Sequence, residues 1–102
     1  MPVRVIPMVH EGVPVEAVEA GWQGGQFVLM VAPSGVLACG VVDPVVMERF
    51  GAAVAVARGT PESPLIHAAD LLAARVAEVT AAAAALGIAP GMTGAEALAK
   101  FA

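Results

Sequence analysis

The hydrophobic positions in the first part of the chain fall into short runs, which are separated by residues that favour chain reversal. The runs cover Val3–His10, Val13–Trp22, Gln26–Ala32 and Val36–Val42. The segments between them contain Glu11-Gly12, Gly24-Gly25 and Pro33-Ser34-Gly35. Paired glycines suit the positive φ angles of hairpin turns, and proline followed by glycine suits a tight turn. The pattern predicts a meander of four antiparallel strands.

The third and fourth runs are hydrophobic at nearly every position. A strand with one solvated face alternates apolar and polar residues, and neither Phe27–Ala32 nor Val36–Val42 does so. Both faces of the predicted sheet must therefore be covered. Helices can cover one face, and either another helix or a second copy of the chain covers the other. Since only 14% of the residues are charged, we expect a homo-oligomer.

A short helix and a fifth strand are predicted after the meander. Asp43 is a typical N-cap, Pro44 suits the first helical position, and a glycine follows the expected end of the helix. The apolar residues Ala52–Ala57 then predict a strand that ends at Arg58. Two prolines and a glycine in Gly59–Pro64 predict an exposed loop.

Helices are predicted for the rest of the chain. Apolar residues recur at steps of three and four from Leu65 to Leu86, which predicts one long helix, with a break near Ala73–Thr80 as the alternative. Gly87 favours a left-handed cap at its end, and Thr93-Gly94-Ala95-Glu96 has the capping-box spacing that begins a last helix. The predicted fold is α+β over residues 1–102, a single domain in which the antiparallel four-strand meander and a fifth strand pack with a short helix and C-terminal helices.

Composition and charge exclude several classes of partner. Hydrophobic residues make up 59% of the 102 residues, so the chain is not of the disordered class. A net charge of -4 offers no basic surface, and we expect no nucleic-acid partner. The longest uncharged stretch, Ala20–Val42, contains glycine, proline and glutamine, and we expect no membrane span. Met1-Pro2-Val3-Arg4 does not resemble a secretory signal, which favours a cytoplasmic protein.

The chain contains one cysteine and two histidines. Cys39 therefore has no partner for an intramolecular disulfide, and the spacing of a zinc site is missing. A metal held by Cys39, His10, His67 and a carboxylate is conceivable in three dimensions, but the spacing does not favour it. We therefore expect neither a metal nor a cofactor.

A set of short motifs runs through nearly the whole chain in order. It comprises Glu11-Gly12-x-Pro14, Leu29-Met30-Val31-Ala32, Gly35, Cys39-Gly40-x-x-Asp43, Leu86-Gly87-Ile88 and Gly91-Met92-Thr93-Gly94-x-Glu96-Ala97-Leu98. This set resembles the YunC-like domain-of-unknown-function family, small proteins of bacteria and archaea. The resemblance implies a small α+β fold without an established activity. The chain departs from the family in a longer stretch between Gly59 and Ala68.

Four residues form the candidate ligand site. Cys39 is the only thiol, and Gly40 beside it lets a ligand approach the backbone, although a thiol in an apolar run is also explained as a buried small hydrophobe. Asp43 is explained as a helix N-cap, and a helix start can also favour an anion. Arg58 can clamp a carboxylate or phosphate, or can simply mark the strand reaching solvent.

Two functional hypotheses follow. The first is a homo-oligomeric binding or structural protein with a small-molecule ligand site near Cys39, Gly40, Asp43 and Arg58. The alternative is an enzyme that uses Cys39 as nucleophile on a small acyl or electrophilic substrate, with His10 or His67 as base. The first class leaves the thiol inert, whereas the second needs a thiol that reacts rapidly at neutral pH. Membership of a hetero-complex also remains open.

Overall fold

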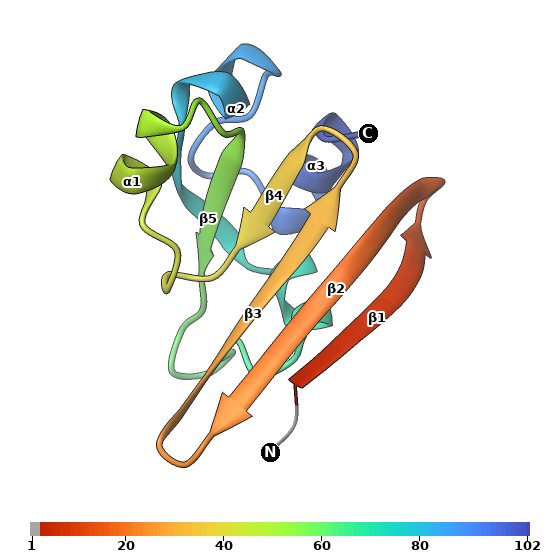
Figure 1. Cartoon of the computed structure of the whole chain (residues 1–102), viewed down its shortest axis with the longest axis vertical. Helices are drawn as coiled ribbons and strands as arrows, with labels where there is room; N and C mark the ends of the chain where they lie inside the picture. The colour runs from red at the N-terminus through yellow and green to blue at the C-terminus, as the bar shows by residue number, and fades with distance from the viewer. Residues whose placement is uncertain (1–2) are drawn as a thin grey trace.

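One six-stranded sheet forms the centre of the computed structural model, which describes residues 3–102; Met1 and Pro2 lie outside the described residues (Figure 1). The strands follow one another in chain order as β1 (Val3–His10), β2 (Val13–Trp22), β3 (Gly25–Ala32), β4 (Gly35–Ala38), β5 (Val54–Arg58) and β6 (Arg75–Val79). Strands β1 to β4 pair antiparallel, β4 and β5 pair parallel, and β5 and β6 pair antiparallel. The predicted α+β class and the meander are confirmed.

The first hairpin shows how the sequence sets the register. Glu11 and Gly12 both have positive φ angles, 49° and 83°, which is the backbone of the tight turn whose twist matches that of the strands. The turn places His10 opposite Val13. Because side chains alternate between faces, this pairing sends Val13, Val15 and Ala17 to the core.

Four short helical elements accompany the sheet. They are α1 (Pro44–Arg49), the 3-10 helix η1 (Ala68–Leu72), α2 (Ala81–Ala85) and α3 (Gly94–Lys100). The side chains of three N-cap residues accept hydrogen bonds from free backbone N–H groups at the starts of α1, α2 and α3. Asp43 accepts from the Val45 N–H, Thr80 from the Ala83 N–H, and Thr93 from the Glu96 N–H. The predicted caps at Asp43 and Thr93, with the capping box at Glu96, are confirmed.

The helical elements divide unequally between the two faces of the sheet. Residues of η1, α2 and α3 join the larger core cluster, in which Leu71, Leu98 and Phe101 are fully buried against Met30 and Leu37. On the opposite side, α1 lies over β4 and β5, where Met47 packs against the cluster of Ala38, Val54 and Val56. In Figure 1, β1 and β2 extend beyond the region that α1 covers.

The side of β1, β2 and β3 that faces away from the larger core is therefore partly bare. Val3, Val5, Val9 and Val31 on this side are all large hydrophobic residues with exposed side chains. We call this surface the open face. We define it by ten residues that the strand register places on this side: Val3, Val5, Pro7, Val9, Pro14, Glu16, Val18, Ala20, Leu29 and Val31. Of the two coverings considered for the second face, another helix is present only over β4 and β5.

The uninterrupted helix predicted from Leu65 to Leu86 is wrong, and the alternative break near Ala73–Thr80 coincides with the strand β6. This stretch holds η1, the strand β6 and α2 instead, so the sheet has a sixth strand. The cause is a β-bulge: Val56 pairs with Glu78 whereas Ala57 pairs with Val76, and Ala77 is left between them. The bulge lets Val76 and Val79 both face the core although they are three residues apart. A bulged strand can therefore imitate helical spacing.

The fourth strand is shorter than predicted. It ends at Ala38, and residues 39–42 form a turn in which the Val42 N–H donates to the Cys39 carbonyl at 3.2 Å. Cys39 thus follows the strand and does not lie within it, and an extended path from Cys39 to Asp43 is excluded. The fifth strand is shifted from Ala52–Ala57 to Val54–Arg58. No helix among residues 3–102 is long and apolar enough to cross a membrane.

Candidate functional site

The candidate site lies at the carboxyl ends of the parallel strands β4 and β5. Because the two strands are parallel, the segments that follow them leave the sheet side by side. These segments are Cys39-Gly40 after β4 and Gly59-Thr60 after β5. In parallel arrangements, ligands bind outside the carboxyl ends of the strands. A depression of about 430 Å³ lies there, lined by Gln26, Cys39, Gly40, Val41, Ala57, Arg58, Gly59, Thr60, Pro64 and Leu65.

Three of the four predicted site residues meet at this depression, which we call the Arg58 site. The guanidinium of Arg58 lies over Gly40: a Cβ atom on Gly40 would stand only 3.3 Å from Nη1 of Arg58. The missing side chain of Gly40 therefore makes room for the guanidinium. The Arg58 side chain remains 57% exposed, and its Nη2 donates to Oε1 of Glu78 at 2.8 Å.

Cys39 lies beneath the depression rather than in its opening. The residue is 7% exposed, its N–H donates to the Val28 carbonyl at 3.1 Å, and its Sγ accepts from the Val28 N–H at 3.5 Å. These bonds continue the pairing with β3 by one residue past the end of β4. The arrangement favours the interpretation of Cys39 as a packed, hydrogen-bonded thiol.

The fourth predicted residue, Asp43, is not part of the Arg58 site. Its Oδ1 accepts from the Val45 N–H at 2.9 Å, so its carboxylate is used as the N-cap of α1. The turn at residues 39–42 separates it from the depression. The structure therefore does not bring Asp43 together with the other three residues at the depression.

The two histidines do not line the Arg58 site either. His10 ends β1 beside the first hairpin, and its buried Nε2 has no hydrogen-bond partner among the described residues. His67 is the N-cap residue of η1 and lines two other depressions. Within residues 3–102, no three His, Cys, Asp or Glu side chains gather as metal ligands. The structure thus brings no base to Cys39 from either histidine.

The segment from Arg58 to His67 borders two further depressions. One, of about 570 Å³, is bounded by Arg58, Thr60, Ser63, His67 and Arg75, among others. Thr60 and Ser63 close a tight turn, in which the Thr60 Oγ1 accepts from the Ser63 N–H at 3.1 Å. The Arg58 guanidinium therefore lies where two neighbouring depressions meet.

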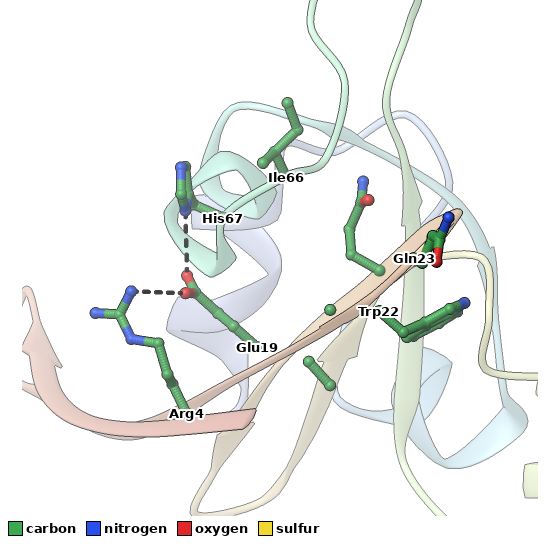
Figure 2. Close-up of a pocket in the computed structure, with 10 residues that line it drawn as sticks. Arg4, Glu19, Trp22, Gln23, Ile66 and His67 are labelled. Carbon is green, nitrogen blue, oxygen red and sulfur yellow. Dashed lines mark ion pairs between the residues drawn. The ribbon is translucent and has the colours of Figure 1, made fainter. Parts of the chain in front are cut away.

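The other depression, of about 460 Å³, contains a charged cluster that the sequence analysis missed (Figure 2). Glu19 points from β2 toward η1, with its carboxylate 3.6 Å from Nη1 of Arg4 and 3.8 Å from Nδ1 of His67. Its Oε2 accepts from the Ala68 N–H at 2.7 Å. Since only 14% of the Glu19 side chain is exposed, the carboxylate mainly fastens the start of η1 to the sheet.

A sequence signal for this cluster does exist in retrospect. Glu19 lies on the strand face that carries Val15 and Ala17, so a charged residue follows core residues on that face. A carboxylate in such a position needs a partner, and here η1 supplies a backbone N–H. Asp70 also stabilises this turn: the N–H groups of His67 and Ile66 donate to it and hold its pKa below the usual value.

Comparisons with known proteins agree with this fold. The structure superposes on the crystal structure of a protein of unknown function from Thermoplasma acidophilum with a TM-score of 0.86, covering 99% of this chain and 94% of that chain at 17% sequence identity. This likeness confirms a shared mixed α+β fold.

The family follows from the sequence. Residues 38–101 match the domain of unknown function DUF1805, and the chain belongs to this family. A comparison with curated proteins found no match. The expectation of a domain-of-unknown-function family is thus confirmed, and the narrower likeness to YunC-like proteins stays a prediction.

Proposed function

We propose that this chain is a binding protein that holds a small anionic molecule at the Arg58 site. The observation that carries the proposal is the placement of an exposed guanidinium over Gly40, at the carboxyl ends of two parallel strands. Arg58 bonds Glu78 through Nη2, Nη1 lies against Gly40, and the Arg58 residue lines the depression. A guanidinium recognises carboxylate and phosphate oxygens through paired N–H groups.

The neighbouring groups suit an anionic ligand of modest size. The Thr60 hydroxyl accepts from Ser63 and keeps its own O–H for donation, and Gln26 and Leu65 border the same depression. Glu78 opposes Arg58 in charge, so a ligand has to compete for the guanidinium. The expected affinity for a single inorganic anion is consequently weak, on the order of millimolar.

The test is a titration of the isotope-labelled protein with inorganic phosphate and, separately, with acetate. We expect amide shifts at Gly40, Gly59 and Thr60 in the two-dimensional NMR spectrum, and an Arg58→Ala variant that binds at least about tenfold more weakly. Arg49→Ala removes the same charge from the end of α1 and serves as the matched control. Shifts that survive Arg58→Ala unchanged, or no shifts with either anion, would refute the proposal.

The cysteine-dependent enzyme is the weaker candidate. Its nucleophile lies 7% exposed beneath the depression, and its Sγ accepts a backbone N–H. A nucleophilic thiol is partly exposed and has a cation or base beside it. We therefore propose Cys39 as part of the floor of the ligand site.

A further inference from the structure

We propose that a second copy of this chain covers the open face, so that two subunits pack sheet against sheet in a dimer. The surface concerned is the side of β1, β2 and β3 opposite the larger core. The inference does not depend on the ligand proposal, because the open face and the Arg58 site lie on different parts of the sheet.

The open face carries little charge, and this favours an apolar partner surface. Among its ten residues, only Glu16 is charged. Val3, Val5 and Val9 are 61%, 57% and 69% exposed. Beside them, a hollow of about 590 Å³ is lined by Pro7, Val9, Pro14, Glu16 and Val31, among others. An apolar surface with one charged residue can pack against a second copy of itself, as a two-fold symmetric interface requires.

The edges of the sheet disfavour the other common way of joining two sheets, which is pairing between edge strands. The turn after His10 has two residues, which fixes the residues of β1 that form hydrogen-bonded pairs with β2. The N–H and C=O groups of Ile6 and Met8 point toward β2. Those of Val5, Pro7 and Val9 point away from the sheet. Pro7 has no N–H, so the outward ladder of β1 is interrupted. At the other edge, Val76 exchanges backbone bonds with Met92 and Gly91. The open face is therefore better suited to association than either edge.

The area needed for a stable dimer shows how far the contact extends. Three strands of eight residues, about 3.4 Å per residue and about 4.8 Å apart, cover roughly 400 Å². A stable dimer buries about 800 Å² on each partner. The remainder is available beside the open face, where α1 lies on the same side of the sheet. Val45, Val46 and Phe50 are exposed there, Phe50 to 77%. The α1 helices thus flank the sheet contact.

The test compares three variants that each add one lysine. Val31→Lys and Val5→Lys place a charge within the open face, and Val31→Lys stands opposite Glu16, which can pair with it in a folded monomer. Leu86→Lys adds the same charge after α2, away from that face, and is the control. The readout is mass by light scattering on a size-exclusion column, with thermal unfolding to verify that each variant folds.

We expect wild type and Leu86→Lys at twice the 10.2 kDa of one chain, and both open-face variants at 10.2 kDa with cooperative unfolding retained. Wild type at 10.2 kDa at every concentration would overturn the proposal. So would an assembly whose mass neither open-face variant changes, because another surface would then hold it together. A monomer that binds phospholipid vesicles through Val5 and Val31 would also overturn it, since lipid would be the occupant.

Discussion

At the residue scale, two small residues decide what the Arg58 site can do. Gly40 has no Cβ, so the Arg58 guanidinium can lie across the backbone and reach Glu78. Cys39 turns inward from the same loop and bonds to Val28. The exposed groups of the Arg58 site are therefore the guanidinium of Arg58 and the hydroxyl of Thr60, and the Cys39 thiol is buried beneath them.

Cys39 is expected to react slowly while the protein is folded. Its low exposure means that a thiol reagent reaches Sγ only when the turn after β4 opens or the chain unfolds. The measurement is the rate of alkylation at neutral pH with and without urea. We expect labelling that accelerates as denaturant unfolds the protein. Rapid labelling of the native protein would support the nucleophile hypothesis instead.

Thr80 is a second residue whose removal has a defined cost. It is buried at 2% exposure, where its hydroxyl accepts from the Val54 N–H at 3.0 Å and donates to the Ala52 carbonyl at 2.6 Å. Thr80→Val leaves both backbone groups buried without this partner. We expect urea unfolding to show a loss of about 1–3 kcal/mol. Thr80→Ser keeps the hydroxyl and is expected to lose less; an equal loss in both variants would contradict this account.

At the element scale, the limits of sequence reasoning are visible in β6. The turns, the meander and the N-caps could be predicted because each depends on residues within a few positions of one another, such as Glu11-Gly12 or Thr93 with Glu96. The bulge at Ala77 depends on pairing with β5, about twenty residues away, and its apolar spacing is that of a helix. Local pattern alone cannot distinguish the two cases.

The candidate site was predicted in part for the same reason. Arg58 could be placed at a strand end because a charge follows an apolar run, and the structure brings it together with Cys39 and Gly40 at one depression. The end of β4 was not read correctly, since the predicted strand continued through Cys39 to Val42. Asp43 was misplaced because a turn at residues 39–42 replaces an extended path. Glu19 was missed because its main partner, the Ala68 N–H, lies 49 residues away in the chain.

The short element η1 should weaken in acid. Its start depends on Asp70, whose pKa is lowered by the N–H groups of His67 and Ile66. A carboxyl whose pKa is lower in the folded state stabilises the protein above its unfolded-state pKa, and this contribution disappears as the pH falls through the folded-state pKa. We expect Asp70→Asn to lower the stability measured by urea unfolding at pH 7, with the difference from wild type shrinking below about pH 4. A difference that grows in acid would contradict the assignment.

At the scale of the whole molecule, the sheet has two surfaces with separate roles. The carboxyl ends of β4 and β5 present polar groups around Arg58, and the side of β1 to β3 away from the larger core presents valines. Because α1 covers only the β4 and β5 part of that side, the molecule is left with a bare region that a second copy can cover. Ligand binding and association should accordingly respond to different substitutions.

The measurement that tests this separation most directly is native mass spectrometry of wild type, Arg58→Ala and Val31→Lys prepared in the same way. One spectrum reports both the number of subunits and any mass that the folded protein retains. The account predicts a dimer for wild type and Arg58→Ala, and a monomer for Val31→Lys. Any anionic molecule retained by wild type should be missing from Arg58→Ala. A wild-type monomer, or an Arg58→Ala variant that loses the dimer, would contradict the account.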